Sequence, residues 1–288
     1  MIKFLPLPLT GALALLLLLL IVFRCRRPRE LTRAFQPFSI VSRRIVSSGH
    51  RPTIFLTVRV STASLPTGAH VKLRALLPGA AAPTIRSYTP TRFHKGECEL
   101  MFRVYSGGPM TQHLASLRVG DAVDMMGPTG LERYGEAGPG TFSRGTHMTW
   151  REISHVGMIA GGTGVTPMLQ IANHVLQDPL DSTALHLLSF CNSCDDFMLE
   201  EELAGLAGGS GGQMRLTLIA SKMKGEEVKR RPGVVHASMR ELKAGQLKVL
   251  LGLPAGPSTM VCVCGPDGFV TKAKELLAEA GVENVLVW

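Results

Sequence analysis

A glycine-rich run at residues 161–168, Gly-Gly-Thr-Gly-Val-Thr-Pro-Met, is the segment of this chain that most clearly predicts chemistry. The apolar run at 156–160 before it is typical of a buried parallel strand, and the apolar spacing after it is that of a helix. We expect Thr166 to be the N-cap of this helix and Pro167 its first residue. Glycines at such a turn let backbone N–H groups approach a phosphate, and a helix N-terminus adds about half a positive charge. The run therefore predicts a site for a dinucleotide pyrophosphate.

The same pattern also fits a tight turn that binds nothing. Its order is not Gly-x-Gly-x-x-Gly, so it departs from the usual dinucleotide-binding fingerprint. It also differs from the phosphate-binding loop of nucleoside triphosphatases, since no Lys-Ser or Lys-Thr follows the glycines. The evidence for a nucleotide site has to come from further segments.

Two other segments supply that evidence. Cys264-Gly265-Pro266 follows an apolar run at 259–263 and precedes a second helical pattern. Residues 86–90, Arg-Ser-Tyr-Thr-Pro, combine a guanidinium suited to a diphosphate, an aromatic ring suited to stacking, and a hydroxyl suited to a ring heteroatom. The order and separation of the three segments are more specific than any one of them.

In this order the segments resemble the ferredoxin–NADP reductase superfamily, and most closely the NADH-cytochrome b5 reductases, over residues 36–288. The resemblance is carried by short segments at residues 65–71, 86–90, 102–105, 108–111, 120–121, 127–130, 161–168 and 264–266. It implies a six-stranded antiparallel FAD-binding β-barrel at residues 37–146, followed by an NAD(P)-binding α/β domain with a doubly wound parallel sheet at residues 153–288. It also implies FAD, NADH or NADPH, and hydride transfer between them.

The resemblance implies roles for the residues at matching positions. The implied FAD contacts are Arg86, Ser87, Tyr88, Thr89, Arg103, Val104, Tyr105, Gly108, Met110 and Thr111. The implied contacts of the nicotinamide nucleotide are Gly161, Gly162, Thr163, Gly164, Thr166, Pro167, Ser221, Lys222, Cys264, Gly265 and Pro266. Thr89, Thr166 and Cys264 are implied to act where the two rings meet, with the cysteine placing the nicotinamide. Because the cofactors carry the chemistry, we expect no side-chain general base.

Two positions depart from the family pattern. Close relatives carry a Lys where Pro109 stands, which removes one implied contact to an FAD phosphate. NADH-specific relatives carry an Asp where Ser221 stands, and here Lys222 and Lys224 follow instead. Since that carboxylate would repel the 2′-phosphate of NADPH, we predict that this chain accepts NADPH as well as NADH.

The N-terminal segment predicts a membrane anchor. Residues 4–23 are almost entirely apolar and uncharged, and as a helix they would cross the ~30 Å core of a bilayer. Arginines follow in residues 24–36, which we expect to form a basic linker. By the positive-inside rule, an anchor at 1–23 leaves the folded part in the cytoplasm, on the endoplasmic reticulum or the mitochondrial outer membrane. A cleaved signal peptide is the alternative, but the apolar run is long for one and lacks a small-x-small cleavage site.

The remaining chain divides into two patterns of elements. Strands are expected at 38–41, 53–60, 70–76, 98–104 and 122–126, with a short helix at 110–116 and a flexible hinge at 135–152. After residue 153, strands at 156–160, 184–190, 214–220, 260–264 and 285–288 alternate with helices at 167–177, 196–207, 236–243 and 269–280. Such alternation predicts a parallel sheet whose ligands bind at the carboxyl ends of the strands.

Charge and cysteine content narrow the class of partner. The formal net charge is +9, but no basic-aromatic interleaving or known recognition element supports nucleic-acid binding. A basic face that attracts an acidic redox protein fits better. The spacing of Cys191-x-x-Cys194 and Cys262-x-Cys264 is compatible with a zinc site or a redox-active pair. Cytoplasmic thiols, however, usually stay reduced. We expect no metal.

These observations predict a membrane-anchored FAD-dependent oxidoreductase that takes a hydride from NAD(P)H and passes single electrons to a haem protein. The acceptor that the family implies is cytochrome b5 or a similar small acidic haem protein. The cysteine spacing of plant-type ferredoxins is absent, so the acceptor is expected to be a separate partner. Two alternatives remain: electron transfer to a quinone or other membrane redox partner, and a non-enzymatic membrane-tethered descendant.

Overall fold

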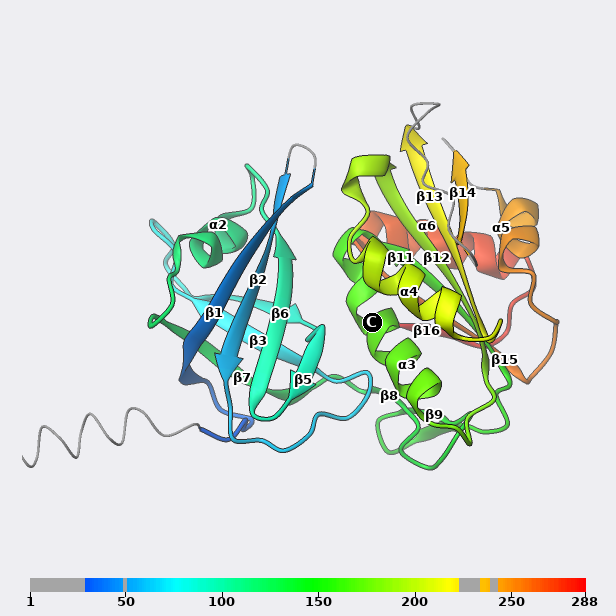
Figure 1. The fold of residues 1–288 in the computed structure, drawn as a ribbon, viewed down its shortest axis with the longest axis horizontal. Helices are drawn as coiled ribbons and strands as arrows, with labels where there is room; N and C mark the ends of the chain where they lie inside the picture. The colour runs from blue at the N-terminus through cyan, green and yellow to red at the C-terminus, as the bar shows by residue number, and fades with distance from the viewer. Residues whose placement is uncertain (1–28, 49–50, 223–233, 239–242) are drawn as a thin grey trace, which may run out of the picture.

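An antiparallel β domain and an α/β domain lie side by side in the computed structural model (Figure 1). The structure describes residues 29–48, 51–222, 234–238 and 243–288. The predicted anchor at 1–23 and the predicted linker up to residue 28 lie outside these ranges. Among the helices in the described ranges, none has the length and apolar character that a bilayer span requires.

The β domain is one antiparallel sheet, and its strands follow the order β4-β3-β7-β1-β2-β6-β5. The strands are β1 (Gln36–Ser48), β2 (Arg51–Arg59), β3 (His70–Ala75), β4 (Thr84–Tyr88), β5 (Arg92–His94), β6 (Glu97–Arg103) and β7 (Ala122–Thr129). A short helix, α2 (Pro109–Ser116), follows β6. Inward-facing residues such as Phe38, Leu56 and Leu100 form its core. The expectation of an antiparallel sheet is confirmed.

The expected number of strands, six, was wrong, because this sheet has seven. Sequence reasoning missed two of its strands, β4 and β5, and β4 carries Arg86 and Tyr88. The residues of β4 are exposed or half-buried throughout, so they lack the apolar alternation that marks a strand. Pairing with β3, in which Leu73 lies opposite Arg86, holds β4 in place instead.

The segment expected to be a flexible hinge, 135–152, contributes two strands to an ordered small sheet. β8 (Glu132–Tyr134), β9 (Phe142–Arg144) and β10 (Met148–Trp150) pair antiparallel in the order β10-β9-β8. The ring of Tyr134 packs edge-on against Phe142, with centroids 4.8 Å apart, and its hydroxyl donates to Asp181 Oδ2 at 2.6 Å. Two buried aromatic rings and a buried hydrogen bond thus stabilise this segment, although its glycines and prolines favour an irregular backbone.

The α/β domain is built on a parallel sheet of order β14-β13-β12-β11-β15-β16. Its strands are β11 (His155–Gly161), β12 (Ala184–Ser193), β13 (Met214–Lys222), β14 (Val234–Ser238), β15 (Thr259–Cys264) and β16 (Val285–Val287). Its helices are α3 (Val165–Gln177), α4 (Glu200–Gly209), α5 (Ala244–Leu251) and α6 (Asp267–Glu279). The expected parallel sheet is confirmed.

Alternate residues of the central strand face two separate cores. In β11, Met158 packs with α3 and α4, whereas its neighbour Ile159 packs with α5 and α6. The helices therefore cover both faces of the sheet, and the turns that follow β11 and β15 meet at its carboxyl edge. This is the edge at which parallel sheets bind ligands.

The helix expected at 236–243 was wrong. Val234–Ser238 form strand β14, which pairs in parallel with residues 216–220 of β13. The β-branched pair Val234-Val235 favours a strand, and a place at the sheet edge leaves Val235 59% exposed. Residues 239–242 lie outside the described ranges, and α5 begins at Ala244.

The two domains share a packed interface. Phe55 in β2 and Met101 in β6 lie opposite each other in register, and both point away from the core of the β domain. They are buried in the apolar cluster of α3 and α4 instead. A continuous apolar contact of this kind sets the relative position of the two domains.

A buried histidine in β12 makes stability depend on pH. His186 Nδ1 lies 2.7 Å from the Leu251 carbonyl oxygen and Nε2 lies 3.0 Å from Thr217 Oγ1. Burial lowers the pKa of His186. As the pH falls below about 6.5, the unfolded chain therefore binds a proton before the folded chain does, and the free energy of unfolding falls.

We expect acidification from pH 7 to pH 5.5 to destabilise the wild type more than a His186→Gln variant. The excess is at most about 1.4 kcal/mol per pH unit. Urea unfolding followed by circular dichroism at both pH values measures it. Equal losses in the two proteins would contradict the assignment, since His186 would then titrate alike in the folded and unfolded chains.

Candidate active site

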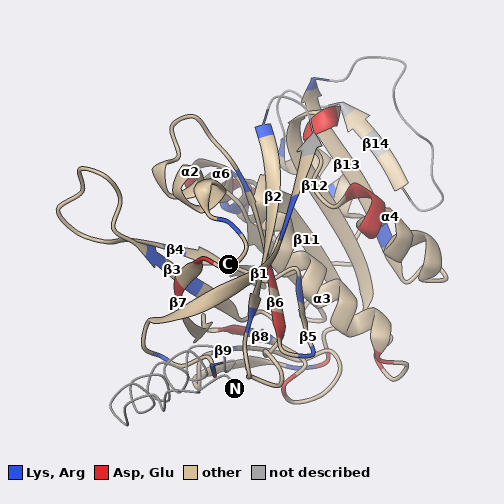
Figure 2. Cartoon of the chain, turned by 60° about the vertical axis from the view of Figure 1, so that its left-hand side comes forward, with Lys and Arg blue, Asp and Glu red and all other residues tan. Residues whose placement is uncertain are grey.

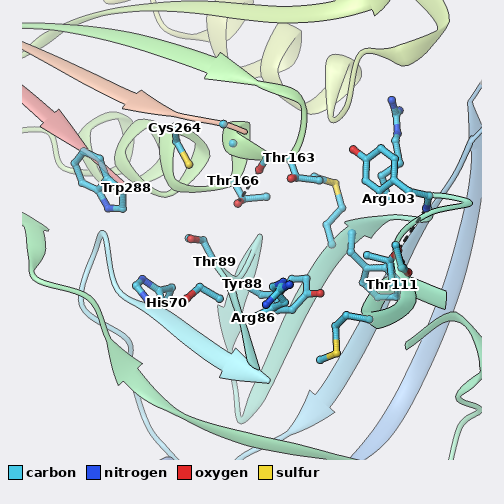
Figure 3. A pocket seen from close by; sticks show the side chains of 18 of the residues that line it. His70, Arg86, Tyr88, Thr89, Arg103, Thr111, Thr163, Thr166, Cys264 and Trp288 are labelled. Carbon is cyan, nitrogen blue, oxygen red and sulfur yellow. Dashed lines mark hydrogen bonds between the residues drawn. The ribbon is translucent and has the colours of Figure 1, made fainter. Parts of the chain in front are cut away.

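A cavity of about 540 Å³ opens between the two domains, a volume typical of small-molecule and cofactor sites. The β domain contributes the end of β4, the end of β6 and the start of α2. The α/β domain contributes the turn after β11, the end of β15 and Trp288. Figure 3 shows the side chains of the two walls directed toward one space.

The wall from β4 carries Arg86, Ser87, Tyr88 and Thr89. The Tyr88 ring packs edge-on against Phe102, at 6.3 Å between centroids, which leaves part of the ring exposed to the cavity. Burial raises the pKa of Tyr88 to about 12, so its hydroxyl is a neutral donor at physiological pH. The Arg86 guanidinium is exposed and donates to the Ile85 carbonyl oxygen at 2.8 Å. This wall offers a cation and an aromatic ring side by side.

The N-terminal end of α2 forms the next part of the wall. Gly107, Gly108, Pro109, Met110 and Thr111 all line the cavity. Pro109 is the first residue of the helix, where the missing N–H costs nothing. The Thr111 hydroxyl donates to the Gly108 carbonyl oxygen at 2.9 Å and fixes the turn. The helix N-terminus therefore presents its positive end to the cavity.

The opposite wall is the turn between β11 and α3. A 3-10 turn at Gly162–Gly164 leads directly into α3, which begins at Val165. Thr166 is consequently inside the helix, and the expectation that it is the N-cap was wrong. Its hydroxyl donates to the Thr163 carbonyl oxygen at 3.1 Å. Thr163, Thr166 and Pro167 still line the cavity.

Gly164 lines the cavity at a point where two backbone turns lie close together. A Cβ on this residue would collide with the carbonyl group of Cys264 and would lie 2.7 Å from the Gly265 nitrogen. The glycine therefore lets the turn after β11 lie against the turn after β15. Close backbone approach between the two turns therefore requires glycine here.

Cys264 lies at the carboxyl end of β15 and lines the same cavity as Thr89 and Thr166 (Figure 3). Burial raises the pKa of the Cys264 thiol to about 11. The thiol is therefore protonated at neutral pH and is a poor nucleophile. Trp288 lies beside it, and its Nε1–H donates to the Gly68 carbonyl oxygen across the domain boundary at 3.1 Å.

Some of the predicted site residues lie outside the cavity wall. These are Val104, Gly161, Gly162, Ser221, Lys222 and Pro266. Ser221 and Lys222 end β13, with Lys222 opposite Ser193 at the end of β12. They lie at the carboxyl edge of the sheet. Arg103 and Tyr105 line the cavity, but the Arg103 guanidinium is bound to Asp196 at 2.9 Å.

Sequence reasoning also missed residues of the wall, namely His70, Thr84, Met101, Phe102, Gly107 and Trp288. His70 was not among the expected site residues, although it stands in segment 65–71, which carries the family resemblance. Burial, with help from Lys72 and Arg133, lowers the pKa of His70. The position of His70 could have been found from that segment, whereas Trp288 has no local motif and reaches the cavity only through the fold.

The residues of the cavity fit FAD and a nicotinamide nucleotide. Arg86 and the N-terminus of α2 provide positive charge for a diphosphate, and the exposed part of the Tyr88 ring provides a flat apolar surface. The opposite wall offers the hydroxyls of Thr163 and Thr166 and the neutral thiol of Cys264. In the described ranges, no group of three or more His, Cys, Asp or Glu side chains could hold a metal ion.

Two family profiles match separate parts of the chain. Residues 37–134 match the oxidoreductase FAD-binding domain, and residues 158–275 match the oxidoreductase NAD-binding domain. The chain is 36% identical over 222 residues to NADH-cytochrome b5 reductase 2 of Gallus gallus, covering 72% of this chain and 68% of that protein. It is 31% identical over 250 residues to NADH-cytochrome b5 reductase 3 of Rattus norvegicus, covering 81% and 79%.

Solved structures show the same fold. The cytochrome b5 reductase domain of Ulva prolifera nitrate reductase superposes with a TM-score of 0.77 at 23% identity, covering 91% of this chain and all 100% of that one. A ferredoxin NADP+ reductase from Neisseria gonorrhoeae with bound FAD and NADP superposes with a TM-score of 0.61 at 15% identity, covering 88% and 98%.

Proposed function

Because the chain belongs to the NADH-cytochrome b5 reductase family, we propose that it passes electrons from NAD(P)H through FAD to a small acidic haem protein at a membrane. Membership of the family shows that the chain is an NAD(P)H-dependent flavoprotein reductase with FAD- and NAD-binding domains. The haem acceptor, the membrane anchor and the role of each site residue are the proposal.

The observation that carries the proposal is the shared cavity. Thr89 on the β domain and Thr166 and Cys264 on the α/β domain line one space. When bound, FAD supplies hydride acceptance and one-electron release, and the protein supplies orientation and electrostatics. In the proposed arrangement Arg86 and the N-terminus of α2 hold the diphosphate, and Tyr88 packs against the flavin. Thr166 and Cys264 then orient the nicotinamide from the opposite wall.

Charge distribution supports an acidic partner. Figure 2 shows Lys and Arg along β1 and β3 of the β domain and acidic residues on α4. Arg43 and Arg44 lie on β1, and Lys72 and Arg74 lie on β3. Arg44 pairs with Glu99 and Arg74 with Asp124, so these two charges are partly neutralised within the chain. Opposite charges on two redox proteins raise the rate of encounter, and salt screens this attraction. Reduction of the haem acceptor should therefore slow as ionic strength rises.

The acceptor assay tests the function. Purified protein should be yellow, and with NADH or NADPH it should reduce added cytochrome b5 faster than a soluble quinone. Faster reduction of the quinone would contradict the proposed haem acceptor and indicate that a quinone accepts the electrons. A folded but colourless protein that cannot take up FAD would overturn the enzyme altogether and favour a membrane-tethered interaction module.

The proposed anchor is tested separately. Residues 4–23 are apolar and are followed by arginines, so full-length protein should sediment with membranes and resist extraction by high salt. Removal of residues 1–28 should release an active enzyme. Co-fractionation with markers of the endoplasmic reticulum or of the mitochondrial outer membrane distinguishes the two expected locations. A full-length protein recovered free of membranes would contradict the anchor.

Cofactor preference gives a second test of the site. Ser221 and Lys222 end β13 at the edge where the adenosine half of the nucleotide is proposed to lie. We expect wild-type kcat/KM with NADPH to be more than about a tenth of that with NADH, because no carboxylate stands at Ser221. A Ser221→Asp variant should lose about tenfold in kcat/KM with NADPH, since its carboxylate would face the 2′-phosphate.

The Ser221→Asp variant also carries its own control, because NADH lacks the 2′-phosphate. Its kcat/KM with NADH should stay within about twofold of the wild type. Steady-state kinetics with both nucleotides give the ratio. A wild type that uses NADPH at less than a tenth of its NADH efficiency would show that residues other than Ser221 set the preference.

A further inference from the structure

Hydrogen bonds from helix α3 join the two domains beside the cavity. Gln170 Oε1 accepts from the backbone N–H of Gly68 at 3.0 Å, and Gln170 Nε2 donates to the carbonyl oxygen of Pro90 at 3.1 Å. One turn further along α3, His174 Nδ1 lies 2.9 Å from Thr67 Oγ1. A single side chain of the α/β domain therefore binds two separate segments of the β domain.

The spacing along α3 links this contact to the cavity. Thr166, Gln170 and His174 are four residues apart, so they lie on one face of the helix. Thr166 lines the cavity, and the next two residues on that face contact the β domain. The helix that places Thr166 thus also holds the β domain through Gln170.

Pro90 directly follows Thr89, which lines the opposite wall of the cavity. On the other side of Thr89, Tyr88 is paired with Val71 of β3. Proline has a fixed φ and no N–H, so the carbonyl oxygen is the only backbone hydrogen-bonding group that Pro90 offers. We call the two hydrogen bonds of Gln170, to Pro90 and to Gly68, the clamp. Thr89 lies between this clamp and the pairing of Tyr88 with β3.

The Gly68 peptide is held equally firmly. Its φ is +93°, and a Cβ there would lie 2.6 Å from the Glu132 carbonyl oxygen, so only glycine fits. Its N–H binds Gln170 and its carbonyl oxygen accepts from Trp288 Nε1 at 3.1 Å. Trp288 and Gln170 both belong to the α/β domain, so the peptide is fixed to that domain from two sides.

We propose that Gln170 is a positioning residue that sets the gap between Thr89 on one wall of the cavity and Thr166 on the other. This inference rests on the proposed function, in which the flavin and the nicotinamide meet in that gap. A neutral amide suits the task because it supplies a donor for Pro90 and an acceptor for Gly68 at once. Displacement of reacting groups by about 1 Å can cost about a hundredfold in rate, so small changes in the gap should be visible.

Two variants and a control test the proposal. Gln170→Met removes both hydrogen bonds with little change in volume, and Gln170→Glu keeps the acceptor for Gly68 but loses the donor to Pro90. Gln177→Met, at an exposed position near the end of the same helix, is the matched control. Should Gln170→Met fail to fold, Gln170→Glu carries the test alone.

Two measurements are made on each protein. Hydrogen exchange at the Gly68 amide in the FAD-free full-length chain reports the clamp without any cofactor. Stopped-flow absorbance of the FAD-loaded protein reports the limiting rate of flavin reduction and its half-saturating NADH concentration.

In Gln170→Met we expect faster exchange at Gly68 and a limiting rate of flavin reduction that is lower by about tenfold or more. The half-saturating NADH concentration and the FAD content should stay within about twofold of the wild type, since neither ligand contacts Gln170 in the proposed arrangement. Gln170→Glu should retain the exchange protection of Gly68 and still lose rate. Gln177→Met should match the wild type in both measurements.

The possible failures are distinguishable. A limiting rate within about twofold of the wild type in both Gln170 variants would overturn the positioning role and leave the proposed function intact. Unchanged exchange at Gly68 in Gln170→Met would overturn the clamp itself. A wild-type protein whose flavin neither NADH nor NADPH reduces would overturn the proposed function, and the positioning role with it.

Discussion

Replacement of Gly164 by alanine is expected to lower the rate of flavin reduction by NAD(P)H by about a hundredfold, which is the loss that a misplacement of about 1 Å produces. The new Cβ would collide with the backbone carbonyl of Cys264 and would lie 2.7 Å from the Gly265 nitrogen. Backbone atoms cannot rotate away as a side chain can. The Cys264 backbone is also held in the sheet, because β15 pairs with β11 in a register that places Ala160 opposite Cys264.

The collision at Gly164 can be relieved only by separating the turn after β11 from the turn after β15. Thr166 and Cys264, which stand on these two turns, would then move relative to each other. The FAD-binding wall belongs to the other domain, so the FAD content should stay within about twofold of the wild type. Stopped-flow absorbance with NADH and extraction of bound FAD measure the two quantities.

Gly268→Ala is the matched control for Gly164→Ala. Gly268 lies in the first turn of α6, close to the same edge of the sheet, but a Cβ there would meet no atom within 4 Å. Its rate of flavin reduction should remain within about twofold of the wild type. Equal rates in Gly164→Ala and the wild type would show that the contact between the two turns does not control the nicotinamide cleft.

Gly164 also shows what sequence could and could not predict about this site. The strand, the glycines and the helix around residue 161 follow from local apolar periodicity and turn chemistry, and the structure has them. The purpose of Gly164 depends on Cys264, a hundred positions away in the chain. No local pattern encodes that contact, so it could not be predicted from the glycine-rich run itself.

The elements that sequence reasoning missed share a physical cause. β4 has an exposed strand pattern and is held by pairing with β3, while the small sheet of β8, β9 and β10 is held by Tyr134 and Asp181, which are far apart in the chain. Gln170 was likewise invisible, because its two partners lie on another domain. Periodicity finds elements with a continuous apolar face, whereas these features depend on long-range partners.

Replacement of Arg103 by methionine is expected to reduce the free energy of unfolding by about 3 kcal/mol, the usual cost of removing one partner of a buried ion pair. Arg103 ends β6 and is 4% exposed. Its Nη1 lies 2.9 Å from Asp196 Oδ1, and its Nη2 donates to the Asp196 carbonyl oxygen at 3.1 Å. Asp196 belongs to the other domain, so the pair crosses the interface next to the cavity.

The size of this effect follows from what Asp196 would lose. The Asp196 side chain is 19% exposed, and Ser193 Oγ donates to its Oδ2 at 3.0 Å. Without the guanidinium, a largely buried carboxylate would keep that one hydroxyl donor but lose its counter-charge. Removing the charge as well should recover much of the stability, because an apolar pair of similar volume carries no desolvation penalty. The double variant Arg103→Met/Asp196→Leu should therefore be more stable than Arg103→Met alone.

Urea unfolding of the single and double variants measures both expectations, with Lys272→Met as the control. Lys272 and Glu275 form an exposed pair at 3.4 Å on α6, and such pairs contribute less than about 1 kcal/mol.

If Arg103→Met lost no more stability than Lys272→Met, the ion pair between Arg103 and Asp196 would not hold the domains together. A double variant less stable than Arg103→Met would show that the Asp196 carboxylate is stabilised by groups other than Arg103. Recovery of stability in the double variant would distinguish the cost of an unpaired charge from a general loss of packing. Removal of Asp196 can reverse the cost of leaving its carboxylate unpaired, but it cannot restore packing that was lost with Arg103.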